Sequence, residues 1–137
     1  MARAFAPVLA RNGGGAIVNV LSVASWMNGP MLATYGASKS AAWALTNGLR
    51  IELAGQRTQV VGLHAGFIAT DLAGDIDAPK SSPEEIARTT LEALEHGEGQ
   101  VLADEISRRV HRGLSADHPA YFQTTAALRS NAGRPAE

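Results

Sequence analysis

A tyrosine and a lysine stand four residues apart in the segment Tyr35-Gly36-Ala37-Ser38-Lys39. Residues spaced by four share one face of a helix, so we expect the phenol and the ammonium group to lie close together. A nearby cation favours the phenolate form of a tyrosine. The pair therefore predicts a tyrosine that could exchange a proton near neutral pH. The alternative is a helical tyrosine and a solvated lysine that have this common spacing by chance.

Ser22 directly follows the apolar segment 16–21 and precedes Tyr35 by thirteen residues. The apolar run predicts a parallel strand that is buried on both faces. Residues at the carboxyl ends of such strands face the ligand crevice of an open α/β sheet. A hydroxyl beside a phenol can hold a carbonyl oxygen for proton delivery. Ser22, Tyr35 and Lys39 are therefore the predicted catalytic residues.

Two strands and the helix between them would position these side chains. Apolar residues at helical spacing predict a helix over 33–55, and 59–64 is a second candidate for a buried strand. Strand, helix and strand with short connections form a βαβ unit and require a parallel sheet. The predicted fold class is α/β, part of a Rossmann-like doubly wound parallel sheet.

A loop and a capped helix are expected after the second strand. The loop 66–80 carries turn formers and follows a strand, which makes it a candidate substrate lid. Ser82 precedes Pro83, and Glu85 follows three residues after Ser82, a pattern typical of a helix start. This helix is expected to end near Gly97.

Weaker signals predict the remaining elements. These are a helix over 2–11, a turn at 12–15, a short strand at 101–103, a charged helix from 104 to about 115 and a frayed tail over 131–137.

The segments 15–25 (GAIVNVLSVAS) and 35–39 (YGASK) together resemble the Ser and Tyr-x-x-x-Lys core of the short-chain dehydrogenases/reductases. The segment 64–71 (HAGFIATD) looks like the Pro-Gly loop of that family. The similarity spans residues 1 to about 110. It implies an NAD(P)-dependent oxidoreductase that moves hydride between NADP or NAD and a small carbonyl or alcohol substrate.

The resemblance implies a role for each matched residue. Tyr35 would be the general acid/base, Lys39 its partner and a ribose contact, and Ser22 would orient the substrate oxygen. The cofactor-binding residues that the resemblance implies are Tyr35, Lys39, Gly66, Ile68 and Thr70. The family's dimers imply a homo-oligomer that packs the helices 2–11 and 33–55.

Trp26, Met27 and Met31 lie between Ser22 and Tyr35 in the sequence. By resemblance they could form a substrate wall with Ser22, and apolar packing explains them equally well. An apolar wall favours a hydrophobic ketone or alcohol only weakly. The substrate therefore stays open.

Two departures from the family pattern matter. Ala65 replaces the usual proline of the loop. The family's Gly-rich phosphate loop, Asn-Asn-Ala-Gly segment and catalytic asparagine lie upstream of the serine, and only twenty-one residues precede Ser22. The cluster Gly13-Gly14-Gly15 comes before a strand and predicts a turn. The chain thus resembles the carboxyl-terminal, catalytic half of the family, and a truncation, a mispredicted start and a trimmed chain all stay open.

Composition excludes other classes of function. The 137 residues are 45% hydrophobic and 18% charged, with a formal net charge of −1 and no cysteine. This predicts one partial domain over 1–137 without nucleic-acid or membrane binding, and cytoplasm is the default location. His64 is expected to be a packed histidine, and the scattered histidines predict no metal site.

Two rival functions remain. The missing phosphate loop motivates a truncated, non-catalytic remnant that acts as an interaction module through an exposed sheet edge. A sugar-nucleotide epimerase uses similar tyrosine and lysine residues, but the contexts of Ser22 and Thr70 look more like a simple reductase.

Overall fold

The computed structural model describes residues 1–29, 32–116, 119 and 121. Met31 and the predicted tail 131–137 lie outside these residues. The described elements follow one another as α1 (Ala2–Arg11), β1 (Gly15–Val20), the 3₁₀ turn η1 (Val23–Ser25), α2 (Ala33–Leu53), η2 (Ala54–Gln56), β2 (Thr58–His64), η3 (Asp71–Ala73), α3 (Pro83–Glu95), β3 (Gln100–Leu102) and α4 (Glu105–Gly113).

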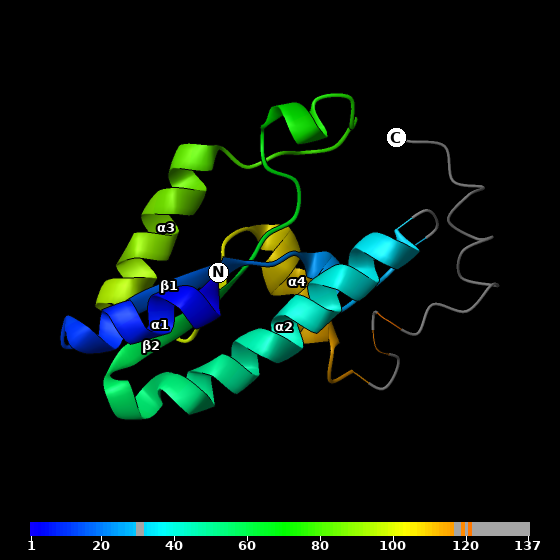
Figure 1. Ribbon diagram of the computed structural model, residues 1–137. Helices are drawn as coiled ribbons and strands as arrows, with labels where there is room; N and C mark the ends of the chain where they lie inside the picture. The colour runs from blue at the N-terminus through cyan, green and yellow to red at the C-terminus, as the bar shows by residue number, and fades with distance from the viewer. Residues whose placement is uncertain (30–31, 117–118, 120, 122–137) are drawn as a thin grey trace.

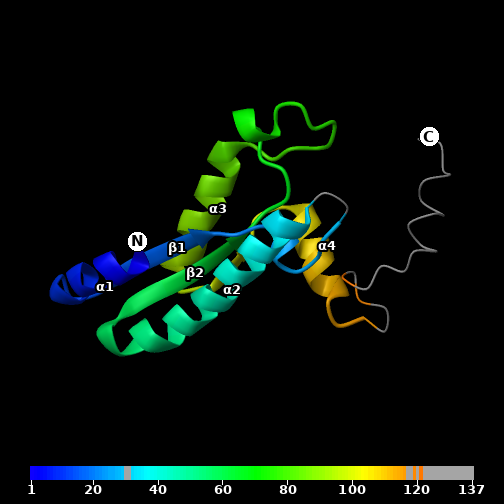
Figure 2. The same ribbon diagram turned by 45° about the vertical axis from the view of Figure 1, so that its right-hand side comes forward.

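The three strands form a parallel sheet in the order β1-β2-β3. Both views show α2 on one side of the strands and α3 on the other (Figure 1, Figure 2). Alternation along β2 explains this arrangement, because successive side chains point to opposite faces. Val61 and Leu63 pack with Ile86 of α3, whereas Gly62 faces Thr46 of α2. The α/β prediction is confirmed.

The strand predicted to be buried on both faces is instead a half-exposed edge strand. Gly15, Ala16 and Val20 are exposed, and the exposed fraction of Val20 is 57%. Within the described chain β1 pairs only with β2, so no described strand pairs with its other edge. The central strand β2 is buried almost throughout, as predicted for 59–64.

Two tight turns meet at the amino ends of β1 and β2. Arg57 has left-handed backbone with φ 56°, and its carbonyl oxygen accepts a hydrogen bond from the Gly15 N–H at 3.2 Å. Gly14 has φ 124°, and a Cβ there would lie 2.4 Å from that same oxygen. Only glycine permits this approach, and the contact starts the register that pairs Gly15 with Thr58.

The helix ends follow their sequence signals. Ser82 accepts a hydrogen bond from the Glu85 N–H at 3.1 Å and caps α3, with Pro83 in its first turn. Gly97 has φ 74° and lets the Glu98 N–H reach the Ala93 carbonyl, which closes the helix. None of the described helices has both the length and the apolar character that a membrane crossing needs.

Candidate active site

Tyr35 and Lys39 lie on one face of the first turns of α2, as their spacing predicts. The Lys39 Nζ is 5.7 Å from the centroid of the Tyr35 ring. Lys39 also donates a hydrogen bond of 2.9 Å to the carbonyl oxygen of Val20, the last residue of β1. Tyr35 is 41% exposed, so its phenol is open to solvent while Lys39 anchors the helix to the strand end.

A close packing of Asn28 against Gly36 positions the start of α2. A Cβ at position 36 would lie 2.6 Å from the Asn28 Nδ2, so this helical position requires glycine. Asn28 donates to the Ala33 carbonyl at 3.4 Å and accepts from the Gly29 N–H at 3.1 Å. The asparagine thereby joins the loop after Ser22 to the helix that carries Tyr35.

Ser22 lies at the carboxyl end of β1, where the sheet pairing continues past the strand. The Leu21 N–H donates to Leu63 and the Val23 N–H donates to Ala65. Ser22 is 8% exposed, and its Oγ accepts a hydrogen bond of 3.2 Å from the Ala24 N–H, which caps η1. Among the residues that the structure describes, no hydrogen bond joins the Ser22 hydroxyl to Tyr35.

His64 is the last residue of β2, contacts the Ser22 backbone and has no solvent exposure. Its Nδ1 is 3.1 Å from the Ser25 Oγ and 3.3 Å from the Ser22 carbonyl oxygen. Burial lowers the pKa of His64 from 6.5 to about 4, the hydrogen bond with the Ser22 backbone opposes this change, and the charge of His111 adds to it. His64 is therefore a neutral, packed histidine, as the sequence analysis expected.

Trp26 packs in the interior and does not form an open wall. It is 8% exposed, and its ring stacks on His64 with a centroid distance of 3.7 Å and an angle of 16°. Trp43 of α2 meets it edge-on at 6.4 Å. Packing accounts for Trp26, whereas Met27 is half-buried.

The loop after β2 holds three of the predicted cofactor-binding residues, and the backbone of two of them is already paired within the protein. The Gly66 N–H, expected to face a cofactor, donates to the Asp104 Oδ2 at 2.6 Å. Ile68 packs against the apolar core and pairs with Ser81 in an isolated bridge. Thr70 is exposed, and its hydroxyl has a long contact of 3.4 Å to the Ile68 carbonyl.

Asp104 is a residue that the sequence analysis treated only as a helix start. It is 8% exposed, and its Oδ1 accepts from the Ser107 N–H at 2.7 Å while Oδ2 accepts from Gly66. The Ser107 hydroxyl accepts from the Asp104 N–H at 3.1 Å and completes a capping box. The spacing Asp-x-x-Ser after an apolar strand is the signal that could have found this cap.

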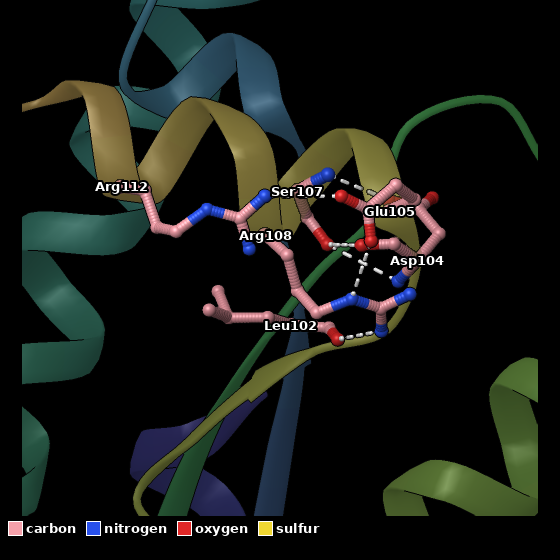
Figure 3. Close-up of polar contacts among 6 residues, drawn as sticks. All are labelled: Leu102, Asp104, Glu105, Ser107, Arg108 and Arg112. Atoms are coloured by element: carbon pink, nitrogen blue, oxygen red, sulfur yellow. Dashed lines mark hydrogen bonds and ion pairs between the residues drawn. The ribbon is translucent and has the colours of Figure 1, made fainter.

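Two arginines hold Glu105 in the same turn (Figure 3). Arg112 is 3.0 Å and Arg108 3.1 Å from its carboxylate oxygens, and these hydrogen bonds lower the pKa of Glu105. Arg108 also donates to the Leu102 carbonyl at 3.3 Å, which ties α4 to the end of β3. The charged helix expected from 104 thus carries exposed ion pairs, and the described residues contain no group of three metal-ligating side chains.

The family model described as short chain dehydrogenase matches residues 1–81, more than half of the chain. The chain belongs to this family. The human dehydrogenase/reductase SDR family member 4 is 34% identical over 107 residues, which cover 78% of this chain and 38% of that protein. A 3-oxoacyl-[acyl-carrier-protein] reductase from Synechocystis is 31% identical over 64% of this chain and 39% of that reductase.

Solved structures of the family share the fold. A short chain dehydrogenase from Burkholderia cenocepacia in complex with NADP has a TM-score of 0.81 and 36% identity, over 98% of this chain and 54% of that one. A 7α-hydroxysteroid dehydrogenase complexed with NADH has a TM-score of 0.66 and 25% identity, over 72% and 46%. The chain therefore spans about half of these structures and less than half of the curated relatives it matches.

Proposed function

We propose that the chain carries the acid/base part of an NAD(P)-dependent oxidoreductase that acts on a carbonyl or alcohol. The observation that supports this most is the position of the Lys39 Nζ, 5.7 Å from the centroid of the Tyr35 ring. The same Nζ bonds the carbonyl oxygen of Val20, the last residue of β1 and two residues before Ser22. A phenol, a cation and a hydroxyl then stand at one strand end, where α/β sheets bind ligands.

In this proposal the Tyr35 Oη donates its proton to the carbonyl oxygen during reduction and accepts it back during oxidation. The positive charge of Lys39 stabilises the phenolate that remains after transfer. The Ser22 Oγ accepts from the Ala24 N–H, so its own proton is free to be donated to the substrate oxygen, which orients the oxygen toward Tyr35. Met27 borders the substrate.

The described residues fit the nicotinamide-ribose end of a cofactor. An ammonium group has three donors, and Lys39 uses one of them on Val20, so two remain for ribose hydroxyls. In this proposal the exposed Thr70 hydroxyl and the Ile68 backbone would also contact the cofactor, whereas the Gly66 N–H is engaged by Asp104. When bound, NADP or NAD supplies or accepts the hydride.

The turn at Gly13, Gly14 and Gly15 does not suit a pyrophosphate, because it contacts Arg57 and Leu9 and opens a strand instead of a helix. We propose that the chain represents the catalytic half of the fold. The rest of the cofactor site would then come from further sequence or from another copy of the chain.

Titration of the purified chain with NADPH and then NADH tests the proposal. Cofactor fluorescence would be followed together with size exclusion, and a screen of carbonyl substrates would follow. Saturable binding that Lys39→Met weakens, with turnover of a carbonyl, is the expected result. A folded chain that binds neither cofactor, also when joined to the further sequence that completes the cofactor site, would overturn the proposal and favour an interaction module that uses the exposed edge of β1.

A further inference from the structure

Ser25, which the proposed chemistry does not use, connects the two segments that carry it. Its Oγ donates a hydrogen bond of 2.5 Å to the Ser22 carbonyl oxygen. Its own carbonyl oxygen accepts a hydrogen bond of 2.9 Å from the Ser40 hydroxyl on α2, one residue after Lys39. Ser25 is 4% exposed, so water does not compete for these bonds.

The donors and acceptors around Ser25 assign the tautomer of His64. A carbonyl oxygen only accepts, so the Ser25 hydroxyl proton must point to Ser22. The remaining contact of the hydroxyl, 3.1 Å to the His64 Nδ1, then needs a proton on the nitrogen. The Nδ1–H form also suits the 3.3 Å contact with the Ser22 carbonyl. The His64 Nδ1–H thus donates to the Ser25 hydroxyl and to the Ser22 carbonyl oxygen.

The bond from Ser40 to the Ser25 carbonyl joins α2 to η1 beside the catalytic residues. Within the described residues, it is the only hydrogen bond between η1 and α2. The other side-chain bonds from α2 to this part of the sheet reach β1 instead: Lys39 donates to the Val20 carbonyl, and Thr46 accepts from Asn19 almost two helical turns further on. The contact of Asn28 with Ala33 is longer and exposed.

We propose that Ser25 is a positioning residue that sets the spacing between Ser22 and the Tyr35–Lys39 pair, with His64 holding its hydroxyl as an Nδ1–H donor. The inference rests on the proposed function, and it adds a residue that touches neither substrate nor cofactor. Ser25 acts through Ser22 on one side and through the helix on the other.

Ser25→Ala is the first test. Loss of the two buried hydrogen bonds of the hydroxyl should lower kcat for carbonyl reduction about tenfold and leave KM for NADPH within about twofold. Thr90→Ala is the matched control, because Thr90 is also a buried hydroxyl, bonded only within α3, and its loss should leave kcat unchanged. If Ser25→Ala changes kcat no more than Thr90→Ala does, the proposal is overturned.

A double-mutant cycle separates positioning from general destabilisation. If Ser25 acts through Ser22, then Ser25→Ala should cause little further loss of kcat in a Ser22→Ala background. Equal losses in both backgrounds would overturn the role. Ser40→Ala removes the bond to the Ser25 backbone carbonyl, which Ser25→Ala leaves in place, and should lower kcat about fivefold.

Amide hydrogen exchange distinguishes failure of this inference from failure of the proposed function. If the parent chain turns over no carbonyl, the proposed function fails. Ser25→Ala should still speed amide exchange about tenfold both at Ala24–Trp26 and in the first turns of α2, and Thr90→Ala should not. Faster exchange in η1 alone, or in neither segment, would overturn the link.

Discussion

The carboxyl ends of β1 and β2 lie side by side, yet the chain leaves them in opposite ways. After β1 it enters a buried corner in which Ser22, Ser25 and His64 share hydrogen bonds. After β2 it enters a loop that is exposed over most of 67–80 and is held at its base by Asp104 and Ser81. Proton transfer needs fixed atoms, whereas a ligand must be able to enter and leave.

This difference suggests a division of labour between the two strand ends. The corner after β1 would carry the geometry of the reaction, and the loop after β2 would carry binding. Interior contacts stabilise the fold, while an exposed loop contributes little to the free energy of unfolding. The expected effects of substitutions at the two ends should therefore differ in both kind and size.

Tyr35→Phe should have the largest effect on the reaction side. It removes only the transferable proton, so we expect kcat to fall about a thousandfold, or about 4 kcal/mol in the activation barrier, with cofactor binding retained. Steady-state kinetics together with a fluorescence titration measures both. Tyr121→Phe, which removes the hydroxyl of an exposed tyrosine, is the control. Unchanged turnover would refute the catalytic assignment.

Acid should destabilise the corner after β1 through His64. Because burial lowers the pKa of His64 to about 4, between pH 6.5 and 4 the unfolded chain binds a proton that the folded chain does not. The free energy of unfolding should therefore fall by about 3 kcal/mol as the pH drops from 7 to 4. Urea unfolding across this range checks the slope.

His64→Gln should flatten this pH dependence above pH 4.5. The ion-paired Glu105 also has a lowered pKa, but its contribution is lost only below its ordinary value of 4.5, so Glu105→Gln should leave the upper part of the curve unchanged. A full slope that persists without His64 would show that another group controls acid unfolding.

Asp104→Ala should loosen the base of the loop after β2. It removes a helix cap and the partner of the Gly66 N–H, so we expect a loss of about 2 kcal/mol in unfolding free energy and faster exchange of the Gly66 amide. Ser107→Ala breaks the capping box but leaves the link to Gly66. It should cost about 1 kcal/mol, and an equal effect on Gly66 exchange would contradict the link.

Leu72→Ser should have the smallest effect, because this side chain in the loop is 91% exposed. The free energy of unfolding should change by less than about 0.5 kcal/mol. Leu63→Ala in β2 is the contrast, since Leu63 is 5% exposed and its truncation should cost about 2–5 kcal/mol. A measurable loss at Leu72 would mean that the loop packs more tightly than its exposure indicates.

Local signals predicted most of the fold. The helix expected over 33–55 is α2 followed by a 3₁₀ turn, and the capped helix begins after Ser82 and closes at Gly97. These features depend on neighbours in sequence, which propensities and capping rules describe. The strand over 16–21 was found, but its burial was wrong, because burial depends on what lies across the sheet edge.

The candidate site divides in the same way. The i,i+4 spacing correctly places Lys39 beside Tyr35. The contacts of Gly66 with Asp104 and of Ser40 with Ser25 join residues 38 and 15 positions apart, and no local pattern contains them. The sequence is compatible with Trp26 either in a substrate wall or in the apolar core, and only its stacking on His64 shows that it packs in the core.

The contact of Gly14 with Arg57 lies at the far end of the strands, about 26 Å from Ser22 at about 3.3 Å per residue. It aligns β1 with β2, and a slip of one residue would turn every side chain of β1 to the opposite face. The position of Ser22 relative to His64 thus depends on a contact at the opposite end of the two strands. A substitution at Gly14 would therefore shift the register of β1 against β2 and disturb the distant site, so it would not be tolerated as a change in a turn usually is.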